Sequence, residues 1–297
     1  MKMNRKAVIF GIKGYRLTKN ERAILKNAKP WGIILFSRNI KNLTQLKILI
    51  KDIKKIFRDN RYPILIDQEG GKVSRLNKIA DLSFFSQNLF GKLYEKDKNL
   101  CVNIYEVYVN KVCKIFNEVG ININTVPVLD VLRKESHKVI GTRSFSSNTA
   151  LISKLGDICE NLYKKNKIGT VLKHIPGHGL AKSDSHFNTP VVKNSKTSLI
   201  KNDFKTFKLR KSPFAMTAHV VYSSYDVKNT ATHSKIIINK VIRKLIKFKG
   251  ILMSDDISMK SLKYRIEKNA INALNAGCNL VLHCNGNTNE MTRLAKV

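Results

Sequence analysis

Residues 151–174, LISKLGDICENLYKKNKIGTVLKH, contain the structural unit that repeats along the whole chain. Apolar residues recur at helical spacing from Leu151 to Leu162, and a short apolar run, residues 169–174, follows them and ends in Lys173-His174. The first pattern predicts an amphipathic helix. The second predicts a strand buried on both faces, which is typical of parallel sheets.

The same alternation occurs eight times. The expected strands are residues 7–12, 32–36, 63–67, 121–128, 169–174, 214–219, 250–255 and 278–284. Helical spacing also marks residues 104–119, and Ser234 is a suitable N-cap for a helix over 236–248. Eight such units predict an α/β fold with a single (β/α)8 barrel, a TIM barrel over residues 1–297. A doubly wound open sheet is the alternative. The last helix should be shortened, because the chain stops soon after the last strand, at Val297.

Length and composition agree with one large domain. The chain has 297 residues, of which 43% are hydrophobic, and α/β barrels commonly reach about 250 residues as one domain. The apolar run at 7–12 is too short for a secretory signal, and no run approaches the roughly 18 apolar residues of a membrane helix. We therefore expect a cytoplasmic protein with no membrane association. The five cysteines contain no C-x-x-C pair, so reduced, mostly buried thiols are expected.

The formal net charge of +34 is unusual. Clustered lysines could neutralise the phosphates of a nucleic acid. The lysines are instead spread along the chain without a basic arm, which favours solvated helix faces and no specific nucleic-acid partner. The resulting field could still steer an anionic substrate.

Polar side chains end five of the eight expected strands. They are Asp67, Asp130, Lys173 with His174, His219, and Asp255 with Asp256. The carboxyl ends of the strands in a parallel barrel meet on one face, where barrel enzymes build their active sites. The pattern therefore predicts an active site there, although any one of these residues taken alone could be a structural polar group.

The loop over residues 173–186, KHIPGHGLAKSDSH, is rich in glycine and histidine. Asp184 and His186 are two residues apart, and such residues point to the same face of an extended segment. A carboxylate there can fix one imidazole nitrogen and leave the other free to move a proton. A surface loop with incidental histidines is the alternative.

Several of these segments resemble glycoside hydrolase family 3, in particular the bacterial cytoplasmic β-N-acetylhexosaminidases of peptidoglycan recycling. The matching stretches are GIILF (32–36) with Arg38-Asn39, IDQEGGKV (66–73), NTVPVLDV (124–131), GTRSF (141–145), the 173–186 loop and SDDISM (254–259). They span nearly the whole chain in the family's order. Lys72 and Ile175 stand where the family commonly has Arg and Phe.

The resemblance implies a retaining enzyme that removes terminal β-N-acetylglucosamine from peptidoglycan fragments, such as GlcNAc-1,6-anhydro-MurNAc and its peptides. It implies that Asp255 is the nucleophile, that His186 is the acid/base and that Asp184 is the partner of His186. The residues implied to hold the terminal sugar are Asp67, Arg75, Arg143, Lys173 and His174. Asp256 is expected to be a structural carboxylate. No cofactor and no metal are expected, and the protein should act as a monomer on a small carbohydrate.

Three rival functions remain open. A phosphorylase could use the same Asp and His residues with phosphate as the acceptor. A metallohydrolase could bind a metal through His174, His178, His186, His219 and Asp255, although the nearby cations Lys173 and Arg143 disfavour this. A basic nucleic-acid-binding barrel would show salt-sensitive affinity and no glycosidase activity.

Overall fold

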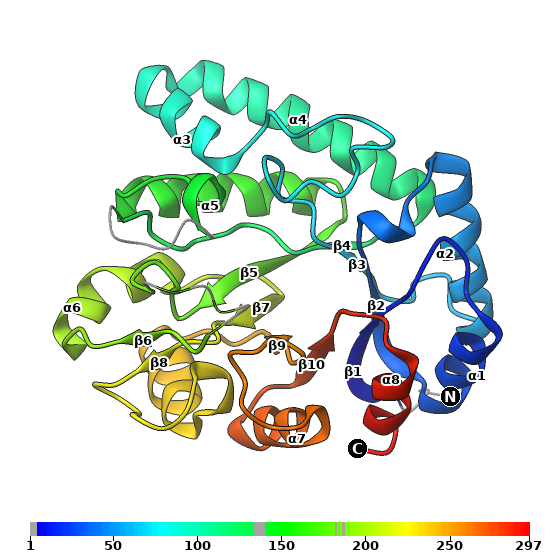
Figure 1. The fold of residues 1–297 in the computed structure, drawn as a ribbon. Helices are drawn as coiled ribbons and strands as arrows, with labels where there is room; N and C mark the ends of the chain where they lie inside the picture. The colour runs from blue at the N-terminus through cyan, green and yellow to red at the C-terminus, as the bar shows by residue number, and fades with distance from the viewer. Residues whose placement is uncertain (1–4, 134–139, 182, 184, 186–187) are drawn as a thin grey trace.

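The computed structural model describes residues 5–133, 140–181, 183, 185 and 188–297. Eight parallel strands form a closed barrel in the order β1-β10-β9-β7-β5-β4-β3-β2 (Figure 1). Each of the eight predicted strands corresponds to one strand of the barrel. The (β/α)8 barrel is confirmed, and the open sheet is wrong.

The barrel strands and the helices between them have the following bounds. The strands are β1 Lys6–Gly11, β2 Pro30–Leu35, β3 Ile64–Ile66, β4 Ile123–Asn124, β5 Gly169–Ile175, β7 Phe214–Thr217, β9 Ile251–Asp256 and β10 Leu280–His283. The α-helices are α1 Lys19–Ala28, α2 Leu43–Phe57, α3 Gln87–Lys96, α4 Lys98–Val119, α5 Thr149–Lys165, α6 Lys196–Lys201, α7 Ile266–Ala276 and α8 Thr288–Leu294. Short 3₁₀ segments lie at η1 Ser37–Asn39, η2 Gly141–Arg143, η3 Asp203–Phe207 and η4 Ala231–His233, and η5 Ile237–Leu245 is π-helical. A separate two-stranded sheet joins β6 Val191–Val192 to β8 Val221–Tyr222.

Strand β4 is shorter than predicted. The sequence indicated residues 121–128, whereas the regular ladder covers only Ile123–Asn124. Pro127 has no N–H to donate to a ladder, and beyond it only an isolated bridge links Val128 to Lys173. The segment after β4 therefore leaves the sheet early, next to the end of β5.

The helix ends follow ordinary capping chemistry. Ser234 Oγ accepts from the backbone N–H of Ile237 at 3.1 Å, as predicted for an N-cap.

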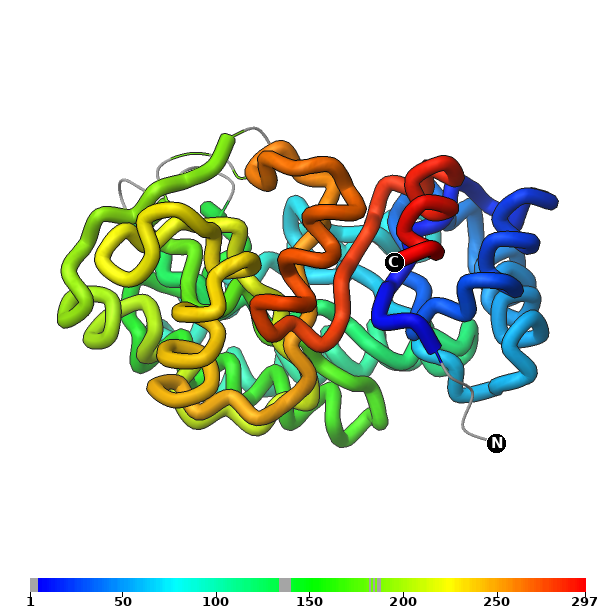
Figure 2. The backbone as a smooth tube through the Cα atoms, turned by 90° about the horizontal axis from the view of Figure 1, so that it is seen from below, coloured from blue at the N-terminus to red at the C-terminus, as the bar shows by residue number. Residues whose placement is uncertain are grey.

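The last helix, α8, is short, as expected, and it packs against α1 and α7 where the two ends of the barrel meet (Figure 2).

The core has two layers. One cluster fills the barrel interior and consists of Ile9, Ile34, Leu65, Ile123, Val171, Met216, Met253, Leu280 and Leu282. A larger cluster lies between the barrel and the surrounding helices. Four of the five cysteines are buried and unpaired, and Cys284 is half-buried. Among the described residues, no helix combines the length and the apolar character needed to cross a membrane.

The interior layer yields a stability prediction. Leu65→Ala should lower the free energy of unfolding by about 3 kcal/mol, because a fully buried leucine in a closed barrel leaves a cavity that cannot collapse. Urea unfolding measures this change. The matched control is Ile48→Ala on α2, where the side chain is 56% exposed, and its effect should stay within about 0.5 kcal/mol. Equal losses in both variants would contradict the assignment of Leu65 to the interior layer.

Candidate active site

A cavity of about 370 Å³ opens at the carboxyl ends of the barrel strands. This volume lies in the range of small-molecule sites. Six of the eight residues predicted for the site line it, namely Asp67, Arg75, Arg143, Lys173, His174 and Asp255. The other two, Asp184 and His186, lie outside the residues that the structure describes.

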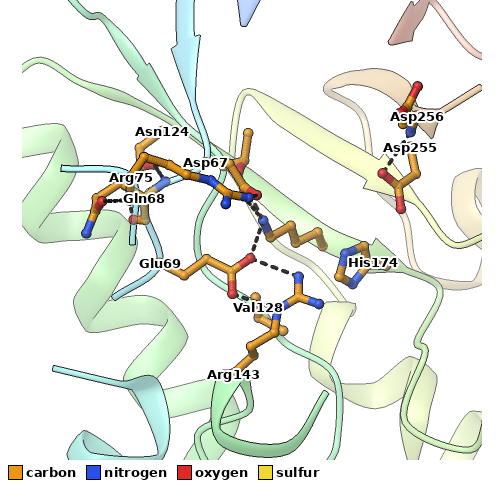
Figure 3. A network of polar contacts seen from close by, with 12 residues as sticks. Asp67, Gln68, Glu69, Arg75, Asn124, Val128, Arg143, His174, Asp255 and Asp256 are labelled. Atoms are coloured by element: carbon orange, nitrogen blue, oxygen red, sulfur yellow. Dashed lines mark hydrogen bonds and ion pairs between the residues drawn. The ribbon is translucent and has the colours of Figure 1, made fainter. Parts of the chain in front are cut away.

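Asp67 and Lys173 form the centre of a network of charges. Figure 3 shows Asp67 with Glu69, Arg75 and Arg143 of this network. The Lys173 ammonium is buried and donates to Asp67 Oδ1, and Thr125 Oγ1 donates to the same oxygen at 2.6 Å. Arg75 donates to Asp67 Oδ2 at 2.9 Å. Burial alone would raise the pKa of Asp67, but the charges of Lys173 and Arg75 outweigh burial and hold that pKa well below its usual range. Asp67 is therefore an ionised hydrogen-bond acceptor at the edge of the cavity.

Glu69 is a second carboxylate in this network, and the sequence interpretation gave it no role. Its two oxygens accept from Nε and Nη2 of Arg143, each at 2.8 Å, and Oε1 lies 2.5 Å from Lys173 Nζ. The Glu69 side chain is 1% exposed. Burial would raise its pKa, but Arg143 and Lys173 lower it. The bidentate pairing fixes the plane of the Arg143 guanidinium.

His174 is oriented by a buried carboxylate. Its Nδ1 lies 2.6 Å from Asp130 Oδ2, and Asp130 also accepts from the backbone N–H of His178 at 2.6 Å. Asp130 is fully buried, and although burial would raise its pKa, His174 lowers it. Because Nδ1 is engaged by Asp130, the other ring nitrogen, Nε2, is the one left for a ligand.

Asp255 lies at the end of β9, and His174 lies between it and the Asp67 network (Figure 3). The backbone N–H of Asp256 donates to Asp255 Oδ1 at 2.8 Å. Burial would raise the pKa of Asp255, but His219 and His174 lower it, so this carboxyl is ionised.

The Asp256 side chain has a different set of partners from Asp255. It accepts from Ser258 Oγ at 2.8 Å and from the backbone N–H groups of Ser258 and Cys284, at 3.0 and 3.2 Å. It therefore ties the segment after β9 to the end of β10, as a structural carboxylate would.

Two further histidines of the metallohydrolase alternative, His219 and His178, lie within the described residues, whereas His186 lies outside them. Both ring nitrogens of His219 have partners, Thr232 Oγ1 at 2.7 Å and the Asp256 carbonyl at 3.0 Å. His178 lines the cavity, with Nε2 3.3 Å from Ser185 Oγ. Within the described parts of the chain, no three His, Cys, Asp or Glu residues gather in a way that could hold a metal ion.

Two residues that carry the site's geometry were present in the sequence but were not assigned to it. Glu69 follows Asp67 by two residues, a spacing that could have suggested a shared face. Asp130 was noted only as a strand-end acid. No local pattern shows that Asp130 reaches back to His174, because that contact joins residues 44 positions apart.

Fold and site together define a barrel enzyme with an ionised carboxylate, an imidazole and charged hydrogen-bonding groups around a small-molecule cavity. The chain belongs to glycosyl hydrolase family 3, because residues 3–297 match the N terminal domain of that family. It is therefore a glycoside hydrolase, and the resemblance drawn from its motifs is confirmed.

Known relatives agree with this membership. The chain is 33% identical over 298 residues to a beta-hexosaminidase of Psychromonas ingrahamii, an alignment that covers 97% of this chain and 85% of the relative. It is 34% identical over 284 residues to a beta-hexosaminidase of Neisseria gonorrhoeae, covering 94% and 78%. The crystal structure of NagZ from Neisseria gonorrhoeae in complex with N-trifluoroacetyl-D-glucosamine is 30% identical, with a TM-score of 0.87, and the match covers 98% of this chain and 85% of that one.

His178 yields a pH prediction. Burial lowers its pKa to about 4, whereas in the unfolded chain the reference value is about 6.5. Between these values the unfolded chain binds a proton that the native protein does not, so stability falls as the pH drops from 6.5 towards 4. Between pH 7 and pH 5, the wild type should lose about 2 kcal/mol more unfolding free energy than His178→Gln. Urea unfolding at the two pH values measures this difference, and parallel losses in the two proteins would show that His178 titrates normally.

Proposed function

We propose that this protein is a retaining β-N-acetylhexosaminidase that removes terminal, non-reducing β-N-acetylglucosamine. The observation that carries the proposal is the position of Asp255, an ionised carboxylate that lines the same cavity as His174 and the Asp67–Lys173 network. The names of the relatives support the hexosaminidase activity. The glucosamine derivative bound to a structural neighbour supports the same sugar.

Asp255 is proposed as the nucleophile. Its carboxylate oxygen bonds to the anomeric carbon as the bond from that carbon to the leaving oxygen breaks, and positive charge develops on the ring in between. His186 is proposed to give a proton to the leaving oxygen and later to take one from the attacking water, which releases the sugar from Asp255. Histidine suits this double role because its reference pKa is about 6.5. Asp184 is proposed to hold the His186 imidazole in one tautomer and to stabilise the protonated imidazolium form.

The sugar is proposed to be held by Asp67, Arg75, Arg143, Lys173 and His174. All five line the cavity, and charged hydrogen bonds of this kind each contribute about 1.5–3 kcal/mol. Among the described residues, nothing donates to or accepts from Nε2 of His174, so this atom is available to a hydroxyl or amide group of the substrate.

The finer parts of the proposal depend on the sequence motifs. We propose that the natural substrates are peptidoglycan fragments, GlcNAc-1,6-anhydro-MurNAc and its peptides. We also propose that residues 1–297 act as one catalytic domain, as a monomer in the cytoplasm, without a cofactor. The positive charge of the chain supports an anionic substrate of this kind, because such a field raises the encounter rate.

The proposed function is tested with an aryl β-N-acetylglucosaminide, with the matching aryl glucoside as control. The wild type should release the aryl group from the first substrate far faster than from the second. Asp255→Ala should abolish this turnover while its thermal unfolding stays cooperative, because the ring would have no group to trap it. Turnover that survives in Asp255→Ala would remove Asp255 from the mechanism.

The same assay separates hydrolysis from phosphorolysis. A hydrolase releases free N-acetylglucosamine at a rate that does not depend on phosphate. A rate that requires phosphate, with the sugar 1-phosphate as product, would establish the phosphorylase instead.

His186→Ala tests the acid/base. Substrates with poor leaving groups should slow by about 100-fold or more, because a general acid typically contributes that much. Activated aryl substrates, whose leaving oxygen needs little protonation, should slow far less in the bond-breaking step. Comparing kcat/KM over a series of leaving groups measures this, and equal losses across the series would count against the role.

A further inference from the structure

Glu69 is the charged group of the network that does not line the cavity. Its carboxylate is buried behind Arg143 and Lys173, which do line it. Both oxygens of Glu69 face cations, two guanidinium nitrogens at 2.8 Å and one ammonium nitrogen at 2.5 Å. Glu69 can therefore act on a ligand only through the two cations that it holds.

Glu69 lowers the net positive charge of the groups beside the cavity. Three cations of this network, Lys173, Arg143 and Arg75, line the sugar-sized cavity, and Lys72 also lines it. Asp67 pairs with Lys173 and Arg75, and Glu69 pairs with Arg143 and Lys173. With both carboxylates ionised, this network of three cations and two anions carries one net positive charge. Removing the charge of Glu69 would raise it to two, next to the cavity.

That extra positive charge matters because of the chemistry proposed above. A glycosidic bond breaks through an oxocarbenium-like state in which the sugar ring becomes positive. Cations that donate to hydroxyl groups also repel this charge unless they are neutralised nearby, and in a buried site the repulsion is weakly screened.

We propose that Glu69 is a positioning residue that orients Arg143 and Lys173 for the sugar hydroxyls and neutralises them against the positive charge of the transition state. The inference rests on the proposed glycosidase function. It assigns Glu69 a part in rate acceleration as well as in sugar binding.

The test compares two ligands of the same shape and different charge. The neutral ligand is N-acetylglucosamine, and the cationic one is its piperidine analogue with a protonated ring nitrogen. Inhibition constants for both are measured in the wild type and in Glu69→Gln, which keeps the shape of the side chain and removes its charge. In Glu69→Gln, affinity for the cationic ligand should fall roughly tenfold more than affinity for the neutral one. For the aryl substrate, kcat should fall by a larger factor than KM rises.

A second variant covers the case in which Glu69→Gln does not fold. Glu69→Asp keeps the charge but shortens the side chain, so it should weaken both ligands by similar factors. Asp157→Asn is the matched control, because Asp157 is also a carboxylate paired with a buried arginine, Arg210, but lies on α5 away from the cavity. It should leave both inhibition constants and kcat unchanged.

The outcomes separate this inference from the proposed function. If the wild type does not cleave the aryl β-N-acetylglucosaminide, the proposed function fails. If the wild type is active but Glu69→Gln weakens both ligands equally, Glu69 is only structural and the inference is overturned. A selective loss of the cationic ligand in Glu69→Asp would overturn it as well, because that variant retains the negative charge.

Discussion

The structure of the site depends on the burial of the Lys173 ammonium group. Lys173 is 2% exposed, and an unpaired charge buried to this extent would cost several kcal/mol. Two carboxylates, Asp67 and Glu69, together with the Thr125 hydroxyl, surround the nitrogen and remove most of that penalty. The lysine is on β5, Thr125 follows β4 and both acids follow β3. Pairing the buried ammonium group therefore fixes these three neighbouring strands relative to one another at the carboxyl end of the barrel.

The chain after β3 is shaped to deliver both acids to that point. Gly70 and Gly71 have φ angles of +86° and +59°, in the region that favours glycine. A Cβ on Gly70 would lie 2.0 Å from the Phe85 carbonyl oxygen, so no other residue fits there. The turn brings Arg75 back to Asp67, and the buried Gln68 carboxamide holds it closed by accepting from the backbone N–H of Arg75 at 2.6 Å. Asn124 anchors the start of the turn through both backbone groups of Gln68. Residues that line the cavity, Asp67 and Arg75, and residues that form the turn therefore share one short segment.

Much of this architecture could be predicted from local sequence. The eight apolar runs predict the barrel strands, and the polar residues that end five of these runs predict the position of the cavity, since the carboxyl ends of parallel strands share one face. Sequence could not give the length of β4, because the effect of Pro127 depends on which neighbour its missing N–H would have bonded. It also could not give the partners of buried groups. His174 and His219 look alike as strand-end histidines, yet the first leaves a nitrogen for a ligand, whereas both nitrogens of the second are bonded within the protein. Such differences arise from contacts between distant segments, and no local pattern encodes them.

Charge is distributed very unevenly between the whole chain and its site. The chain has 55 basic and only 21 acidic residues, yet five of the acids lie together at one end of the barrel: Asp67, Glu69, Asp130, Asp255 and Asp256. The electrostatic field at the protein surface and the field inside the cavity can therefore have separate effects. At about 0.1 M salt, exposed charges are screened beyond about 10 Å, so the lysine-rich surface influences how an anionic ligand approaches more than how it reacts. Buried pairs are screened much less, so the balance among the acids and cations at the cavity sets the energy of charges that form during the reaction. A protein with a large positive net charge can thus keep a cavity in which carboxylates offset the cations, because these carboxylates are buried beside the cations that line the cavity.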